Sequence, residues 1–146
     1  MKLSTRARYG TRALLDLALQ SRSEPVLLKD IAQRQEISLH YLEHLVGPLI
    51  AAGLIRSIRG ARGGISLAKQ PRDIKLSDII LILEGPVAPV ECVTRPETCP
   101  RSEDCVTRDV WNDVKKAING VLESVTLQDL VEKYQQGKSA EVTYYI

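Results

Sequence analysis

The sequence predicts a mainly α-helical protein that carries one small β-hairpin. Its 146 residues include no Phe and a single Trp, so the core must be built from Leu, Ile, Val and Ala, which favours helix. Apolar residues recur at helical spacing along most of the chain. A Gly- and Arg-containing segment, RGARGG at 59–64, separates two short runs of strand-forming residues and is typical of a hairpin tip.

Two helices are expected in the first 35 residues. The first should begin after Ser4, a good N-cap residue, and fade at SRSEP, where Pro25 breaks it. Its inward face consists of Ala7, Leu14, Leu17 and Ala18. A second, short helix fits LLKDIAQRQ at 27–35, with Leu28, Ile31 and Ala32 turned inward.

A third helix and the hairpin follow the turn EIS. The helix, LHYLEHLVGPLIAAG at 39–53, has Ser38 as N-cap and Gly53 at its end, and Pro48 should kink or tighten it. Its expected buried face is Leu42, Leu45, Leu49 and Ile50. The hairpin strands contain Leu54, Ile55, Ile58, Ile65 and Leu67. This order is the winged helix-turn-helix arrangement, in which the third helix fits the major groove of DNA and the hairpin, or wing, reaches the neighbouring phosphates or the minor groove.

The second half begins with a nearly all-apolar helix, DIILILEG at 78–85, which Ser77 and Asp78 should cap and which should be buried. Residues 85–103 contain four prolines and almost no periodicity, and loops of this length tend to be functional or disordered. A long helix is expected from Glu103 to about Glu123 and a final helix from Thr126. The tail GKSAEVTYYI has no clear element.

The long helix carries two apolar stripes. The first, with coiled-coil-like spacing, consists of Val106, Val110, Val114, Ala117 and Val121; the second consists of Trp111, Ile118 and Leu122. A helix that is apolar on two sides usually packs against two partners, here its own domain and a second copy of the chain. We therefore expect a homodimer, with one broad core face as the alternative.

Four segments are predicted from these elements. They are a winged helix-turn-helix DNA-binding domain at 1–75, a connecting helix and cysteine-bearing loop at 76–103, a long dimerisation helix at 104–125, and a C-terminal helix and tail at 126–146.

Charge is divided unevenly between the two halves. Residues 1–75 hold 13 Lys/Arg against 6 Asp/Glu, whereas residues 76–146 hold 7 against 12. A basic first half suggests contact with a polyanion such as nucleic acid, although uneven scatter is the simpler alternative. The start of the chain has no apolar stretch, and the longest apolar run, IILIL at 79–83, is too short to span a bilayer. A cytoplasmic protein is therefore expected, and its thiols should be reduced.

All three cysteines, Cys92, Cys99 and Cys105, lie in ECVTRPETCPRSEDC at 91–105. The spacing lacks the close pairs of zinc ribbons and zinc fingers, and it suits a loop that wraps a larger object such as an iron–sulfur cluster. Nearby Arg95, Arg101 and Arg108 would lower the thiol pKa values. Three free thiols in a flexible loop and a structural zinc site are the alternatives. An enzyme is not expected, because no Ser/His/Asp set or phosphate-binding loop is visible.

Three stretches carry a resemblance to a known family. MKLSTRARYGTRALLDLA, ISLHYLEHLVGPLIAAGLIRSIRGARGG and a three-cysteine loop before WNDV resemble the IscR-type regulators of the Rrf2 family, homodimeric winged-helix transcription regulators of bacteria. The resemblance runs from residue 1 to about residue 130. It implies that Cys92, Cys99 and Cys105 hold a 2Fe–2S cluster, and that cluster occupancy changes which sites the protein binds at iron–sulfur biogenesis genes, as repressor or activator.

Related branches of the family leave other functions open. Some members sense nitric oxide with a 4Fe–4S cluster. Others have no cluster and govern cysteine metabolism, so a cluster-free repressor controlled by thiols or by a partner is an alternative. An iron–sulfur enzyme or electron carrier is the least favoured alternative.

Arg108 departs from the family pattern, since the resemblance implies a histidine ligand there. A guanidinium has no lone pair for a metal. The first cysteine gap is also one residue longer than the family pattern. In the nitric-oxide-sensing branch the fourth ligand is an acidic residue near the partner's N-terminus, and Arg8 stands at the matching position. The remaining candidates are Glu103, Asp104, Asp109, Glu43, His40, His44 or an exogenous ligand.

Candidate DNA-binding residues lie on the third helix and the wing: Ser38, His40, Tyr41, Glu43, His44, Arg59, Gly60, Arg62 and Gly63. A carboxylate such as Glu43 repels phosphate unless it accepts a hydrogen bond from cytosine N4. The resemblance implies a role for Glu43 in sequence discrimination, and a solvent-facing position is the alternative. Arg59 and Arg62 should contact phosphates or the minor groove, their glycine neighbours should permit close approach, and a dimer should read a near-palindromic operator.

Overall fold

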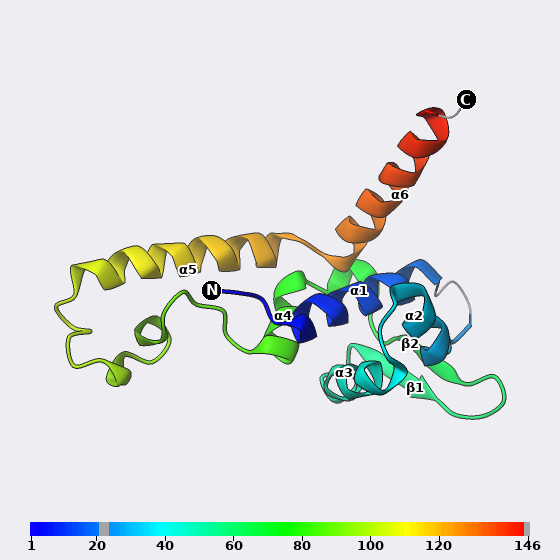
Figure 1. Ribbon diagram of the computed structural model, residues 1–146, viewed down its shortest axis with the longest axis horizontal. Helices are drawn as coiled ribbons and strands as arrows, with labels where there is room; N and C mark the ends of the chain where they lie inside the picture. Colours follow the sequence, from blue (N-terminus) through cyan, green and yellow to red (C-terminus); the bar gives the residue numbers. More distant parts are fainter. Residues whose placement is uncertain (21–23, 145–146) are drawn as a thin grey trace.

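The computed structural model describes residues 1–20 and 24–144 and confirms the mainly helical fold with one hairpin (Figure 1). The helices are α1 (Thr5–Gln20), α2 (Leu28–Gln35), α3 (Leu39–Ala51), α4 (Leu76–Glu84), α5 (Val106–Ser124) and α6 (Leu127–Tyr144). Strands β1 (Ile55–Ile58) and β2 (Gly64–Leu67) form the wing. Short 3-10 turns are η1 (Pro71–Asp73), η2 (Glu91–Val93) and η3 (Pro96–Thr98).

Helix α1 is the centre of the core, and α2, α3, α4 and α6 all pack against it. Ser4 caps it as expected, since its Oγ accepts a hydrogen bond from the Ala7 N–H at 3.2 Å. On α3 the prediction was wrong for Ile50, which is 38% exposed, while Val46 is buried. The steps from Leu42 to residues 45, 46 and 49 keep to one face of a helix, and residue 50 lies beyond it.

The wing is tied to the segment before α2 as well as to itself. Its strands pair antiparallel, with Ile55 opposite Leu67 and Ile58 opposite Gly64. Val26 and Ile65 exchange two backbone hydrogen bonds of 2.8 Å each. At Gly64 (φ +152°) a Cβ would lie 2.5 Å from the Val26 carbonyl oxygen, so only glycine permits this approach. No local pattern in the sequence predicts this bridge, because its two residues are 39 positions apart.

Helix α4 begins earlier and is less buried than predicted. It starts at Leu76, and the N–H of its cap residue Lys75 donates to Asp78 Oδ2 at 3.2 Å. Ser77 and Asp78 therefore lie in the first turn: Lys75 holds the N-cap position, and Asp78 takes part in capping from the third position of the helix. Leu81 is 59% exposed, because the helix turns only one side towards α1.

The C-terminal tail also differs from the prediction, because α6 continues through residue 144. Thr126 and Asp129 start it with two reciprocal bonds: the Thr126 N–H donates to Asp129 Oδ2 at 2.8 Å, and the Asp129 N–H donates to Thr126 Oγ1 at 3.2 Å. Leu127 and Val131 are buried, and Leu127 joins the core of the winged helix. The rest of α6 projects from the body (Figure 1). The last part of α6 has no apolar periodicity that would predict a helix. It is helical because the helix is well capped at its start and contains few helix-breaking residues.

The wing and the cysteine-bearing loop lie at opposite ends of the long axis, with α5 spanning much of the distance (Figure 1). The connection between these ends passes through the contact of α1 with α4. At Gly10 a Cβ would lie 2.1 Å from Leu83 Cδ1, so the two helices meet with no room for a side chain. Glu84 adds a second contact, accepting hydrogen bonds from the Ser4 N–H and hydroxyl.

Gly10→Ala should lower the free energy of unfolding by about 1–3 kcal/mol, because the added carbon overpacks this contact. Leu83→Ala should cost about 2–5 kcal/mol through the cavity it leaves. The double variant should lose less than the two single losses combined, because each change makes room for the other. Urea denaturation of the four proteins measures this, and additive losses would contradict the close packing.

Candidate nucleic-acid interface and cysteine loop

The first turns of α3 present most of the predicted reading residues to solvent. Ser38, His40, Glu43 and His44 are all exposed. The Ser38 Oγ accepts the Tyr41 N–H at 3.2 Å and so begins the helix. Tyr41 itself is half-buried, with its ring perpendicular to that of Tyr9 on α1 at a centroid distance of 6.1 Å. Its ring therefore packs inside the domain, unlike the other four.

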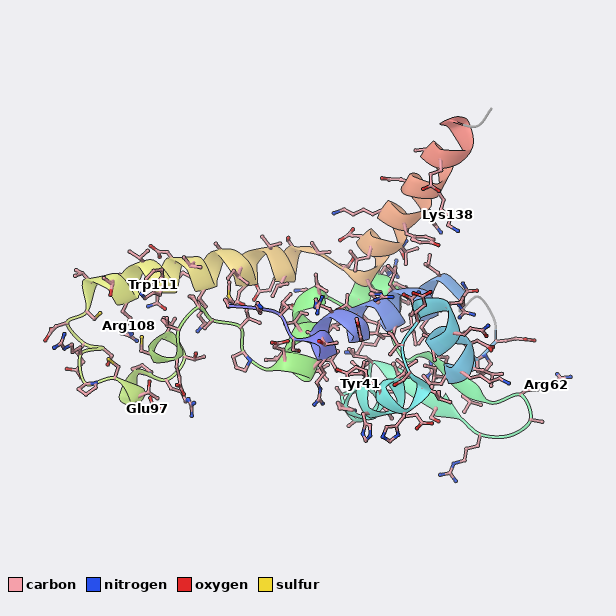
Figure 2. The ribbon with its side chains drawn as sticks, in the orientation of Figure 1. Tyr41, Arg62, Glu97, Arg108, Trp111 and Lys138 are labelled. Carbon is pink, nitrogen blue, oxygen red and sulfur yellow. The ribbon has the colours of Figure 1, made fainter. Side chains whose placement is uncertain are left out.

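The wing tip carries exposed arginines on a turn that depends on glycine. Arg59 and Arg62 face solvent, and Figure 2 shows Arg62 pointing away from the body. Gly60 has φ +107°, and at Gly63 a Cβ would lie 2.3 Å from the Ile58 carbonyl oxygen. These two glycines are required by the hairpin itself, whatever they approach on DNA.

A half-buried ion pair, absent from the sequence prediction, braces α2 against α1: Asp16 is buried, while the Arg34 side chain is 38% exposed. Asp16 Oδ1, on α1, lies 2.6 Å from Arg34 Nη2 on α2. The Gln35 amide donates to Asp16 Oδ2 at 2.8 Å. The hydrogen bond to Asp16 raises the pKa of Arg34 above its usual value, and burial opposes this rise. Because α2 in turn packs on α3, this network helps to fix the reading helix.

Arg108 organises the cysteine loop. Its Nε donates to the Cys92 carbonyl oxygen at 3.1 Å, and its Nη1 donates to the Ser102 carbonyl oxygen at 3.0 Å. Two points of the loop, ten residues apart, are thereby attached to the first turn of α5. Arg108 is labelled beside this loop in Figure 2. The residue that stands where a metal-binding histidine was expected is thus a hydrogen-bonding tether. The sequence suggested only its charge.

Cys105 differs from an ordinary thiol. All three cysteines are unpaired and half-buried, and Cys105 is the N-cap of α5. A hydrogen bond from the Thr107 hydroxyl, at 3.2 Å from Cys105 Sγ, lowers the pKa of this thiol. The Arg108 N–H lowers it further, whereas desolvation and Asp109 act in the opposite direction. Cys105 is therefore suited to react as a thiolate.

The loop as folded does not fit a preassembled iron–sulfur site. Three thiols supply the preferred donor type, but within residues 1–20 and 24–144 no three His, Cys, Asp or Glu side chains are grouped to hold a metal ion. Glu103, Asp104 and Asp109 are exposed. His40, Glu43 and His44 are on α3, far from the loop of the same chain (Figure 1). Among the described residues, therefore, no predicted fourth ligand is grouped with two or more of the three cysteines.

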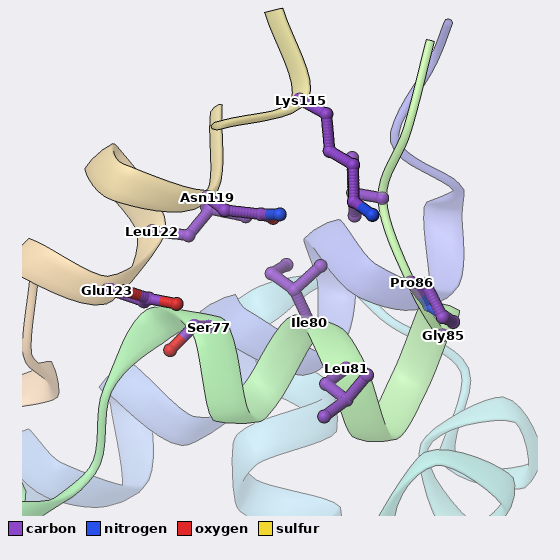
Figure 3. Close-up of a pocket in the computed structure, with 10 residues that line it drawn as sticks. Ser77, Ile80, Leu81, Gly85, Pro86, Lys115, Asn119, Leu122 and Glu123 are labelled. Carbon is purple, nitrogen blue, oxygen red and sulfur yellow. The ribbon is translucent and has the colours of Figure 1, made fainter. Parts of the chain in front are cut away.

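Helix α5 leaves its first apolar stripe open. None of its residues, all of them described, is fully buried. Val106, Val110 and Val121 are 79%, 55% and 63% exposed, and Ala117 is exposed as well. On another side, Leu122 and Asn119 face Ile80 of α4 across a hollow of about 210 Å³ (Figure 3). That volume is below the range of about 300–1,000 Å³ usual for small-molecule sites.

The comparison with known proteins decides the family. Residues 3–133 match the Rrf2 family, described as an iron-dependent transcriptional regulator. The chain belongs to the Rrf2 family. This confirms the resemblance seen in the sequence, and the chain is a DNA-binding transcription regulator with a winged-helix fold.

Relatives with three different names have similar sequence identity to this chain. The chain is 49% identical over 131 residues to "Protein rrf2" of Nitratidesulfovibrio vulgaris, covering 90% of this chain and 87% of that protein. Its fold matches the structure of CymR, the global cysteine regulator of B. subtilis, with a TM-score of 0.80 at 43% identity, covering 91% and 98% of the two chains. It also matches T. potens IscR, with a TM-score of 0.77 at 43% identity, covering 94% and 90%. These Rrf2 relatives are regulators and not enzymes.

No helix in the part of the chain that the structure describes has the length and apolar character needed to cross a membrane.

Thr107→Val should slow alkylation of Cys105 at pH 7, because the lost hydrogen bond raises the thiol pKa and reduces the thiolate fraction. The midpoint of the alkylation rate against pH should move upward, and the plateau at high pH should stay unchanged. Mass spectrometry of iodoacetamide-treated protein measures the rate at Cys105, with Thr94→Val as a control on the same loop. An unchanged midpoint would show that Thr107 does not stabilise the thiolate.

Proposed function

We propose that this regulator is a cytoplasmic homodimer that binds a near-palindromic operator, and that the state of its three thiols controls this binding. The observation that carries the proposal is the position of the thiols. They lie on a loop that Arg108 ties to the start of the helix with the open apolar stripe. A chemical change at the thiols therefore acts directly on the segment that sets the geometry of the dimer.

Dimer formation through α5 would cover the stripe of Val106, Val110, Val114, Ala117 and Val121. Apolar residues spaced by three and four positions suit packing between two helices. The exposed valines have the most apolar surface left to bury, so their burial contributes most to the free energy of association. A two-fold axis along this contact would present two copies of α3 and the wing to neighbouring major grooves. Within each copy, His40, Glu43 and His44 would face base edges, while Arg59 and Arg62 would contact phosphates or the minor groove.

Control by the free thiols is favoured over control by a cluster because of Arg108. The tether already holds the loop through carbonyl oxygens, and Cys105 has a lowered pKa. The cluster form of the proposal, with Cys92, Cys99 and Cys105 as ligands of a 2Fe–2S cluster, requires the loop to gather these thiols and a fourth ligand from outside it. A bound cluster would supply sensitivity to oxygen and iron.

The target genes follow from which form operates. Control by thiols suits genes of cysteine metabolism, in keeping with the similarity to a global cysteine regulator. Control by a cluster suits genes of iron–sulfur cluster assembly, as the sequence resemblance implied. The similarity to the solved CymR and IscR structures is equal at 43% identity and does not choose between them.

Val110→Glu should dissociate the dimer, raising its dissociation constant by about a hundredfold or more. Each dimer would bury two carboxylates in an apolar seam, and each costs at least about 1.4 kcal/mol. Sedimentation equilibrium measures the constant, and Lys116→Glu, which adds a carboxylate away from the stripe, is the matched control. Equal weakening in both variants would show that the stripe is not the interface.

Arg59→Ala should weaken DNA binding for all sequences and reduce its salt dependence. The slope of log K against log salt should fall by about 0.9 for each phosphate contact that is lost. Lys138→Ala, on the projecting α6, is the control and should leave the slope unchanged (Figure 2). Loss of discrimination at one base position, with the slope intact, would instead make Arg59 a base-reading residue.

The mode of control is tested with protein purified without oxygen and DNA selected by it from a random library. A colourless protein, whose affinity for this DNA falls at least about tenfold after peroxide treatment and is restored by thiol reductant, supports control by the thiols. Replacing the three cysteines with Ser should abolish the response. Visible absorption of an iron–sulfur cluster, with different DNA affinity after its removal, would establish the cluster form instead. Equal affinity in every state would contradict both.

A further inference from the structure

The two histidines of the chain lie side by side on the DNA-reading face of α3. They are four residues apart, which places both side chains on one face of the helix. Both are exposed, their Nε2 atoms are 3.3 Å apart, and their ring planes are nearly perpendicular, at 86°. Contacts of the two histidines with base edges would not require their Nε2 atoms to lie close together.

The separation of the two nitrogens indicates the ligand that they suit. At this distance one ring N–H can donate to the other nitrogen when the tautomers are opposite, although the separation is longer than the usual donor–acceptor distance of about 2.9–3.0 Å. Two imidazole nitrogens bound to a tetrahedral zinc ion at about 2.0–2.1 Å stand about 3.3–3.4 Å apart, whereas ligands at right angles on an ion of this size stand about 2.9 Å apart. The observed 3.3 Å matches the tetrahedral case.

We propose that His40 and His44 form a binding site for a zinc-like divalent cation on the DNA-reading helix. Among the described residues no third side chain completes a ligand group, so water or an external ligand takes the other positions. Glu43, exposed on the same turn, adds negative charge beside the site without being a ligand. The loop with the three cysteines lies at one end of the long axis, away from α3, and belongs to a separate site (Figure 1).

Occupation of this site excludes DNA, a consequence that rests on the proposed function. A hydrated cation held by both imidazoles uses their lone pairs and adds bulk on the face that α3 presents to the major groove. Binding of cation and binding of operator therefore compete, and by linkage each weakens the other by the same factor. The chain would then respond to available zinc independently of its thiols.

The binding site is tested by calorimetric titration of the untagged full-length chain with zinc chloride. Cys92, Cys99 and Cys105 are replaced with Ser, so that thiolates do not contribute. We expect one zinc ion per chain, with binding weakened at least about tenfold in both His40→Gln and His44→Gln, because either change destroys the chelate. Glu43→Gln is the matched control and should change the affinity by less than about threefold. Binding of equal strength in His44→Gln would overturn the site.

The competition is tested with the same triple-Ser protein by fluorescence anisotropy of selected DNA. Zinc at saturating concentration should weaken DNA binding at least about tenfold, and a chelator should restore it. The DNA affinity of the double variant H40Q/H44Q should be the same with and without zinc, even if it differs from that of the unmodified histidine pair. Zinc binding at the histidines with unchanged DNA affinity would overturn the competition. Absence of DNA binding without zinc would contradict the proposed function and leave the calorimetric result on the site intact.

Discussion

The contact between Gly10 and Leu83 is the constraint on which the relation between the two ends of the molecule depends. It lets α1 and α4 approach without an intervening side chain, and Ser4 and Glu84 join the same two helices by hydrogen bonds. Since α1 also holds α2 and α3, the reading helix is fixed to the element from which the cysteine loop and α5 depart. Since α5 packs on α4, and α4 on α3, a change in the tilt of α5 would act on α3 through packed helices.

Local signals predicted most of the fold, and the errors have a common physical origin. The caps at Ser4 and Ser38 and the hairpin around RGARGG depend on neighbouring residues, so the sequence alone identified them. The Val26–Ile65 bridge and the Asp16–Arg34 pair join residues far apart in the chain, and nothing local indicates them. The end of α6 escaped prediction because its exposed residues need no apolar period.

In the candidate site, too, some features were visible in the sequence and others only in the structure. Composition and spacing identified the three cysteines, the reading helix and the wing arginines, whereas the role of Arg108 required the structure. A side chain that fails as a metal ligand is, in three dimensions, a donor to two carbonyl groups. Likewise, the sequence counts two histidines on one helix, but only the coordinates show that their nitrogens converge. Tyr41 illustrates the converse, since its position beside exposed polar residues predicted a DNA contact, and the structure adds a packing role in which its half-buried ring contacts Tyr9.

The bridge between Val26 and Ile65 has a consequence for the nucleic acid. The wing is hydrogen-bonded to the segment that leads into α2, and α3 packs on both α2 and β1, so α3 and the wing are two prongs held on one packed unit. When the spacing of the prongs does not match straight B-form DNA, the duplex and not the protein must deform. Such deformation costs least at flexible pyrimidine–purine steps such as TA and CA. If α3 and the wing bind DNA as proposed, base pairs that no side chain touches contribute to operator choice through the bending energy of the duplex.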